Sequence, residues 1–108
     1  MQRSALFRTL GDPTRLAIFE LLAKNEHSVS ELVERFEVTQ PAISQHLGSL
    51  RSARLVSTHR RGRHILYKAR PEGLKPVVDW LHHYQSFWPE KLENLKSVLK
   101  ENPHAPRQ

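Results

Sequence analysis

The sequence predicts an α+β fold that is mainly helical and carries one β-hairpin after its midpoint. Two observations indicate this fold class. Apolar residues recur at steps of three and four over most of the chain, which is the spacing of amphipathic helices. Between Leu55 and Ala69 the period changes to two and strand-forming residues become frequent. The expected order is four helices, two strands and a long C-terminal helix.

A length of 108 residues with 38% apolar residues suits one domain with a modest core. We expect that domain over residues 1–101 and a flexible tail over residues 102–108. The sequence contains no Cys, which excludes disulfides, thiolate metal sites and cysteine nucleophiles. It also lacks the long apolar run of a signal peptide or membrane span, so we expect a cytoplasmic location.

Two short helices are expected at the start of the chain. The first runs from about Arg3 to Leu10 and ends at Gly11, because Gly readily adopts the left-handed conformation that follows a helix. Asp12 and Pro13 begin the second helix, since Asp is a good N-cap and Pro suits the first turn. This helix should end near residue 24.

A break at residues 25–28 precedes a third helix, expected from Glu31 to about Phe36. Either Ser28 or Ser30 caps it, and Ser28 with Glu31 fits the capping box, in which the two residues bond each other's backbone N–H groups. A short turn then leads to the next helix. Two short helices joined in this way are typical of a helix-turn-helix.

The fourth helix, expected within residues 38–54, has the character of a DNA-reading helix. Thr39 is its N-cap and Pro41 lies in its first turn. Its apolar stripe consists of Ile43, Leu47 and Leu50. The opposite face holds small or uncharged residues, namely Pro41, Ser44, Gln45, Gly48, Ser49 and Ser52. A solvated face normally carries Glu and Lys, so this composition favours contact with base edges in a major groove.

A β-hairpin is expected from Leu55 to Arg60 and from Arg63 to Ala69, with Arg61 and Gly62 in the turn. A two-stranded hairpin is marginal alone, so it must pack on the helices. Three arginines at its tip, Arg60, Arg61 and Arg63, suit contact with phosphates or a minor groove.

The charge distribution supports a polyanionic partner. The net charge is +6, and residues 39–70 contain no Asp or Glu but seven positive residues. Because +6 minus +7 is −1, the remainder of the chain is nearly balanced. A basic block that coincides with the proposed reading helix and the hairpin indicates nucleic acid.

A long helical pattern begins at Leu74 and keeps its phase across Pro89, which predicts a kinked helix or two helices that meet near Ser86. Its stripe is long for a small domain, and its aromatic residues would be costly to leave in water. We therefore expect part of it to face a second subunit.

These elements together form a winged helix-turn-helix, and their residues resemble a known family. The motifs are Leu10-Gly-Asp-Pro-Thr-Arg-Leu-Ala-Ile18, Ser30-Glu-Leu32, Thr39-Gln-Pro-Ala-Ile-Ser-Gln-His-Leu-Gly-Ser-Leu50 and Gly62-Arg-His-Ile-Leu-Tyr67. Their combination resembles the ArsR/SmtB family of bacterial transcriptional repressors over nearly the whole chain. The resemblance implies a homodimer, formed by the first and last helices, that binds a palindromic operator and represses transcription.

The candidate site residues form two groups. The DNA-binding candidates are Thr39, Gln40, Ser44, Gln45, His46, Ser49, Arg51, Arg60, Arg61 and Arg63. The dimer-interface candidates are Leu6, Phe7, Leu10, Trp80, Leu81, Tyr84, Trp88, Leu92 and Leu95.

Many members of the family respond to metals, but this chain departs from their sensor motifs. The third helix has no Cys, and Asp79 is followed by Trp80 and Leu81, so the His of the usual Asp-x-His site is missing. The chain therefore resembles the metal-independent branch, and we expect no metal or other cofactor. A metal-responsive repressor that uses Asp79, His82 and His83 is the alternative, because these residues can share one helical face.

Other function classes fit less well. The four glycines are scattered rather than gathered in a phosphate loop, and no His-Glu-x-x-His motif or nucleophile elbow occurs, so we do not expect an enzyme. A winged helix that binds proteins instead of DNA is a further alternative. Such a module has no reason to exclude every acid from its hairpin and fourth helix.

Overall fold

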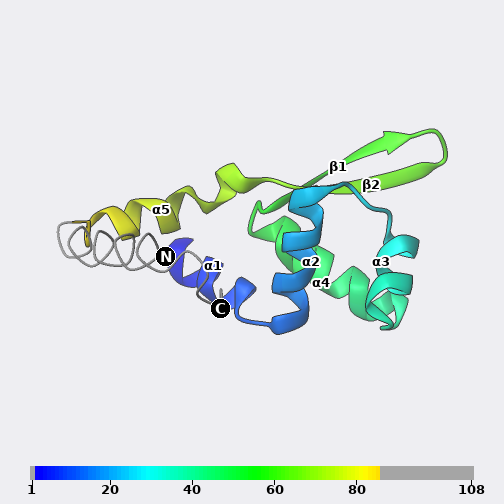
Figure 1. Cartoon of the computed structure of the whole chain (residues 1–108), viewed down its shortest axis with the longest axis horizontal. Coiled ribbons are helices and arrows are strands. Elements are labelled where there is room, and N and C mark those ends of the chain that lie inside the picture. Colours follow the sequence, from blue (N-terminus) through cyan, green and yellow to red (C-terminus); the bar gives the residue numbers. More distant parts are fainter. Residues whose placement is uncertain (1, 86–108) are drawn as a thin grey trace, which may run out of the picture. The chain divides into compact units, whose positions relative to one another are not determined.

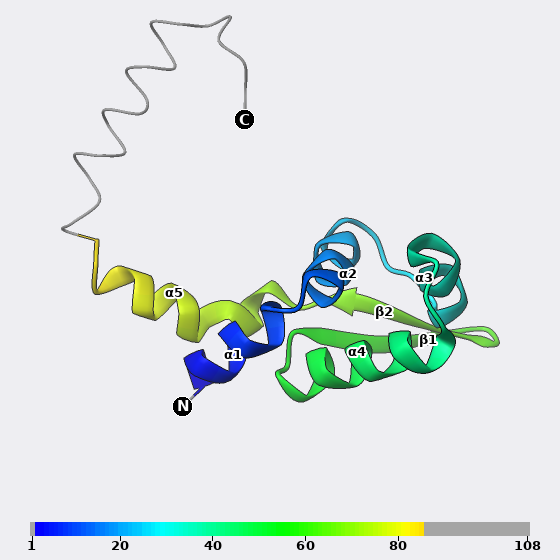
Figure 2. The same cartoon turned by 90° about the horizontal axis from the view of Figure 1, so that it is seen from below.

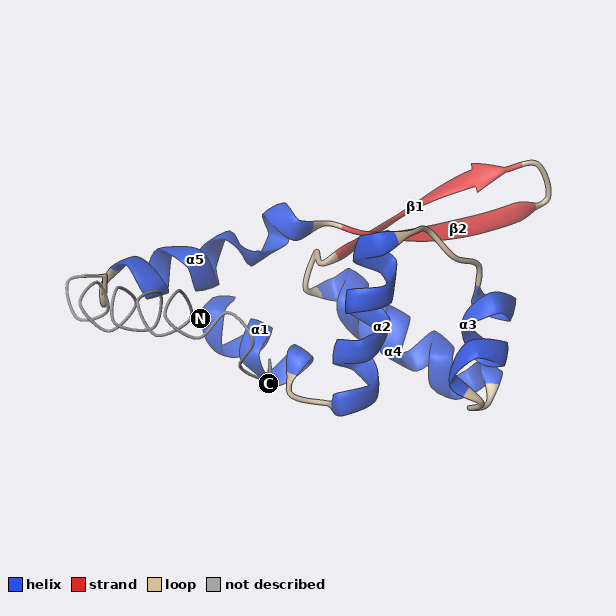
Figure 3. Cartoon of the chain, viewed as in Figure 1, coloured by secondary structure: helices blue, strands red, loops and turns tan. Residues whose placement is uncertain are grey.

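The computed structural model describes residues 2–85 (Figure 1). The chain divides into two compact units, residues 1–77 and residues 78–108, and each is described by itself. The first unit holds four helices, namely α1 (Gln2–Leu10), α2 (Pro13–Lys24), α3 (Val29–Phe36) and α4 (Gln40–Ser52). The antiparallel strands β1 (Val56–Arg61) and β2 (His64–Ala69) follow, then a 3-10 helix (Pro71–Leu74). This order, coloured by element type in Figure 3, confirms the predicted fold class.

Side-chain caps begin the helices as the sequence predicts. Asp12 Oδ1 accepts a hydrogen bond from the backbone N–H of Arg15 at 3.0 Å at the start of α2. At the start of α3, Ser28 Oγ accepts from the N–H of Glu31, and Glu31 Oε1 accepts from the N–H of Ser28. This complete capping box selects Ser28 over Ser30 as the cap, so α3 begins at Val29, earlier than expected.

The core lies between the helices and the base of the hairpin. Its centre contains seven side chains that are almost fully enclosed, Ile18, Leu22, Leu32, Ile43, Leu47, Leu50 and Leu55. The three apolar residues of α4 are all among them, so the predicted apolar stripe of that helix is confirmed. The opposite face of α4 therefore points away from the core.

The end of α4 fixes where the hairpin begins. Arg54 adopts a left-handed conformation with φ 61°, its N–H bonds the carbonyl of Arg51, and the N–H of Leu55 bonds the carbonyl of Leu50. This pair of bonds is a Schellman motif, here with Arg in the position that Gly usually takes. Because Leu50 and Leu55 are both fully buried, the motif also joins the helix end to the core.

The two-residue turn of the hairpin differs by one position from the prediction. Arg61 pairs with His64, so Gly62 and Arg63 form the turn and Arg61 ends β1. Gly62 has φ +62° while Arg63 does not lie in the positive region. A positive φ at only the first turn position is the pattern of a type II′ turn, which matches the twist of the strands.

The hairpin is held to the helices, as its marginal stability alone requires. His27, in the loop between α2 and α3, exchanges two backbone hydrogen bonds with Tyr67 of β2, at 2.8 and 3.0 Å. That loop thereby supplies a one-residue extension of the sheet, which the sequence did not indicate. In both perpendicular views the tip of the hairpin extends past α3 (Figure 2).

The segment after the hairpin approaches Arg54 closely. A Cβ at Gly73 would overlap the carbonyl oxygen of Arg54, so only Gly fits here. That same carbonyl accepts a hydrogen bond from Nη1 of Arg70 at 2.8 Å. The end of α4 and the start of the C-terminal segment are thus joined at one backbone group.

The last described helix, α5, runs from Lys75 to His82 and crosses the boundary between the two units. Residues 83–85, just before the predicted break near Ser86, donate to carbonyls three residues back, which tightens the final turn. The expected kink at Pro89, the seam that includes Trp88, Leu92 and Leu95, and the tail over residues 102–108 lie outside the described residues.

Candidate nucleic-acid interface

The face of α4 opposite the core is exposed and uncharged. Thr39 caps the helix by accepting from the N–H of Ala42 at 3.3 Å. From this start, Gln40, Ser44 and Gln45 are all exposed, while Ser49 is half-buried. Their amide and hydroxyl groups can donate and accept hydrogen bonds, which base edges in a major groove require.

Gly48 is exposed on this face of α4. A Cβ at Gly48 would meet nothing within 4 Å. Its own chain therefore gives no steric reason for Gly, although Gly in a helix interior costs about 0.5–1 kcal/mol relative to Ala. The residue instead permits close approach of another molecule to the backbone of α4.

The side chain of His46 is hydrogen-bonded to another helix. The ring is half-buried, and its Nδ1 accepts a hydrogen bond from Nε of Arg15 at 3.3 Å. Nη1 of the same arginine donates to the carbonyl of Thr9 at 3.3 Å. The contact of Arg15 with His46 joins residues 31 positions apart, so no local sequence signal indicates it.

Asp12 completes this cluster. The N–H of Arg15, donating to the carboxylate, lowers the pKa of Asp12, and the electrostatic effects of the nearby His46 and Arg15 side chains act in the same direction. Burial opposes them only in part. The carboxylate therefore stays ionised beside the two basic side chains over the physiological range.

Glu26 neutralises part of the hairpin charge. Its Oε1 lies 2.8 Å from Nη2 of Arg61, and its Oε2 lies 3.1 Å from Nε2 of His59. The side chain of Arg61 is nonetheless 72% exposed, so this ion pair contributes little to stability. It does determine direction, because it draws Arg61 toward the loop between α2 and α3.

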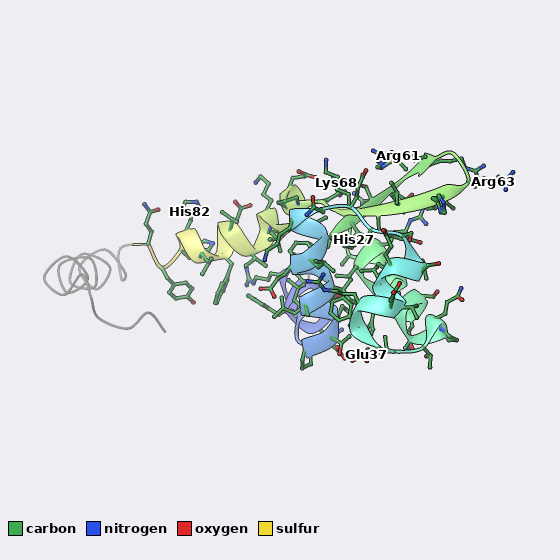
Figure 4. The ribbon with its side chains drawn as sticks, turned by 45° about the vertical axis from the view of Figure 1, so that its right-hand side comes forward. His27, Glu37, Arg61, Arg63, Lys68 and His82 are labelled. Carbon is green, nitrogen blue, oxygen red and sulfur yellow. The ribbon has the colours of Figure 1, made fainter. Side chains whose placement is uncertain are left out.

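The other two arginines of the hairpin carry uncompensated charge. Arg60 is paired in register with Ile65, on the face opposite Arg61, and Arg63 lies in the turn. Both are exposed, and neither forms an ion pair with any residue from 2 to 85. Figure 4 shows Arg63 at the tip of the hairpin and Arg61 farther back along it.

The remaining basic residues divide in the same way. Arg51 on α4 is exposed. Arg70 binds the carbonyl of Arg54 and lies 3.4 Å from a carboxylate oxygen of Glu72, so it has a structural part to play. The basic block of the sequence therefore contains residues that are exposed on the surface, such as Arg51, and residues that form contacts within the fold, such as Arg70.

The apolar residues predicted for a dimer interface differ in their burial. Leu6 is only 3% exposed and belongs to the core of its own chain, while its neighbour Phe7 is 45% exposed. Leu10 is half-buried and packs against the core. In the second unit, Leu81 and Tyr84 are exposed, and the rings of Trp80 and Tyr84 meet edge to face at 5.3 Å. Trp88, Leu92 and Leu95 lie beyond the described range.

The alternative metal ligands do not gather. Within the described part of the chain, no group of three or more His, Asp or Glu residues is placed to hold a metal ion, and Asp79, His82 and His83 are no exception. Nδ1 of His82 instead donates to Oε1 of Gln85 at 2.9 Å. No helix within residues 2–85 is long and apolar enough to cross a membrane.

Comparison with known proteins decides the family. The model of the arsR family of bacterial regulatory proteins matches residues 12–58, which run from the cap of α2 into β1. The transcriptional repressor SdpR of Bacillus subtilis is 32% identical over 73% of this chain and 88% of its own length. The chain belongs to the ArsR family. The family and the matched relatives are transcriptional regulators, and the chain is a DNA-binding transcriptional regulator.

Further ArsR-family proteins extend the similarity. The regulator Rv2034 of Mycobacterium tuberculosis is 43% identical over 86% of this chain and 84% of its own length. The structure of an ArsR-like transcriptional regulator from Rhodococcus sp. RHA1 matches this one with a TM-score of 0.71 and 30% sequence identity. The match covers 90% of this chain and 92% of the Rhodococcus chain. The chain spans 56% and 54% of the length of two other matched mycobacterial regulators.

Proposed function

We propose that this ArsR-family protein is a cytoplasmic repressor that binds a palindromic operator as a homodimer. The exposed, uncharged face of α4 carries the proposal, because Gln40, Ser44 and Gln45 offer hydrogen-bonding groups with no competing charge. Arg51, Arg60 and Arg63 would contact phosphates beside it. The matched SdpR is itself named a repressor, which favours repression over activation.

Geometry and apolar exposure support the proposed dimer. Two copies of α4 reach successive major grooves when their centres lie about 34–36 Å apart. Phe7, Leu81 and Tyr84 remain exposed in the single chain, and a partner would cover such apolar side chains. Burial between subunits would also supplement a modest core.

The decisive experiment identifies the operator and then removes a base-reading residue. Genomic footprinting should recover a palindromic site, and deletion of the gene should raise transcription of the neighbouring genes. Gln45→Ala should then cost about 1–3 kcal/mol of binding free energy at one base pair of each half-site. Ser52→Ala, on the same face but in the last turn, is the control.

Two results would contradict the proposal. If the double variant Gln45→Ala, Arg60→Ala binds the operator as tightly as the wild type, α4 and the hairpin do not form the DNA interface. Reduced transcription after gene deletion would identify an activator in place of a repressor.

A further inference from the structure

Arg15 connects three helices through one side chain. It lies on α2, donates from Nη1 to Thr9 at the end of α1, and donates from Nε to Nδ1 of His46 on α4. We infer that Arg15 is a positioning residue that holds His46 as the tautomer protonated on Nε2, so that His46 donates a hydrogen bond to DNA. This inference rests on the proposed function, since it assigns a role within the same interface.

The chemistry of the two groups determines the tautomer. A guanidinium has only donors, so the nitrogen that faces Nε of Arg15 must offer a lone pair. In a neutral imidazole the proton then resides on the other nitrogen, which is Nε2. The bond of 3.3 Å from Arg15 to Nδ1 therefore specifies a donor at the far end of the His46 ring.

That donor is available to a partner. Within residues 2–85, no side-chain nitrogen or oxygen is both buried and without a hydrogen-bond partner. His46 makes no hydrogen bond through Nε2 to this part of the chain, so Nε2 reaches solvent. Its neighbours on α4 are Gln45 and Ser49, both candidates for DNA contact. A DNA acceptor, either a phosphate oxygen or a base atom such as guanine N7 or O6, suits this donor.

Nitrogen NMR of the imidazole rings tests the tautomer in the free protein. We expect the spectrum of His46, assigned by its loss in His46→Gln, to show an unprotonated Nδ1 and a protonated Nε2. Arg15→Gln should convert this pattern to a mixture of both tautomers. A wild-type ring that is protonated on Nδ1, or already an even mixture, would overturn the inference.

A double-mutant cycle tests whether Arg15 acts through His46. His46→Ala should weaken operator binding about 5- to 150-fold, as expected for a lost specific contact. Arg15→Gln should weaken binding in the wild-type background but add little in the His46→Ala background. Lys24→Gln, on the same helix, corrects for the loss of one positive charge. Additive losses after this correction would overturn the positioning role.

The outcomes separate this inference from the proposed function. If the wild-type protein binds no operator, the proposed function fails, while NMR still reports the tautomer. If Arg15→Gln does not fold, Arg15→Met, which keeps the length of the side chain but has no donor, replaces it in the cycle, and the wild-type spectrum remains decisive. A loss confined to one base pair in His46→Ala identifies a base acceptor, whereas a uniform loss across sequences identifies a phosphate. Unchanged binding by His46→Ala would overturn the contact itself.

Discussion

At the scale of single residues, Arg60 and Arg61 differ because a strand directs successive side chains to opposite faces. Arg61 shares its face with His59 and contacts Glu26, whereas Arg60 shares the opposite face with Ile65. The two adjacent arginines therefore differ in how much positive charge they can offer to DNA. Of these two residues, Arg60 is the one that forms no ion pair within residues 2–85 and is fully available to a phosphate.

We expect this difference in the salt dependence of DNA binding. Arg60→Ala should reduce the slope of log affinity against log salt by about one, because each neutralised phosphate contributes about 0.9. Arg61→Ala should reduce it by less, since Glu26 already balances that charge. Glu26→Gln should raise affinity by releasing Arg61. Titrations at several salt concentrations give the slopes, and equal slopes for the two arginine variants would show that Glu26 releases Arg61 on DNA.

Asp12 gives a prediction for pH. The hydrogen bond from the N–H of Arg15 lowers the pKa of Asp12 in the folded state below the ordinary value of about 3.9. Its contribution to stability is therefore complete above that value and is lost as the pH falls through the lower folded value. Asp12→Asn keeps an N-cap acceptor but cannot titrate.

The wild-type protein should lose more thermal stability than Asp12→Asn between about pH 7 and about pH 3. Thermal unfolding at both values measures the difference. Glu20→Gln, which changes an exposed carboxylate on the same helix, is the matched control. An equal loss in wild type and Asp12→Asn would remove the carboxylate from the stability of this cluster.

At the scale of elements, α4 carries a glycine that its own fold does not need. Gly48→Ala should stabilise the protein by about 0.5–1 kcal/mol, because Ala is the better helix former and its Cβ meets open space. The same change should weaken operator binding, because the added methyl prevents close approach. Thermal unfolding and DNA titration measure the two effects in one variant. A stabilised variant with unchanged affinity would show that DNA does not approach Gly48 closely.

Element boundaries were predictable where a side chain acts locally. Asp12, Ser28 and Thr39 each accept a backbone N–H three residues ahead, and their residue types and spacing reveal this. Glu37 and Arg54 were not predictable as left-handed residues, with φ 53° and 61°. Neither is Gly or Asn, so only the packing of the segments around them determines their conformation.

The candidate site was predictable in its residue types but not in its long-range pairings. The exposed face of α4 follows from helical periodicity, because three buried residues, Ile43, Leu47 and Leu50, define the face that packs against the core. The bonds of Arg15 to His46 and of Glu26 to Arg61 join residues 31 and 35 positions apart. No local pattern encodes such contacts, so Arg15 and Glu26 were missing from the predicted site.

At the scale of the whole molecule, the oligomeric state is the main prediction. Leu81 is 49% exposed in the second unit and Ile65 is 48% exposed on the hairpin, so each offers a similar apolar area. We expect Leu81→Asp to convert a dimer to a monomer and to weaken operator binding, because the two half-sites are then bound independently. Ile65→Asp should leave the dimer intact. Sedimentation at micromolar concentration distinguishes these states, and a monomeric wild-type protein would contradict the proposed dimer.

The two-residue turn of the hairpin has a consequence for how this protein can diverge. Arg61 and His64 pair across Gly62 and Arg63, and near this turn His59 and Arg61 of β1 contact Glu26 while Arg60 lies on the opposite face of the strand. A substitution at Arg60, the exposed even position, can therefore adjust the affinity for any DNA without changing the contacts of Glu26, whereas Val56, on the same face, is buried in the core. An insertion of one residue in β1 would move the side chains beyond it to the opposite face of the strand. Substitutions that change DNA affinity would then also change stability. Near the tip of the hairpin, strand parity thus separates DNA affinity from the contacts of Glu26, and selection can change the two independently.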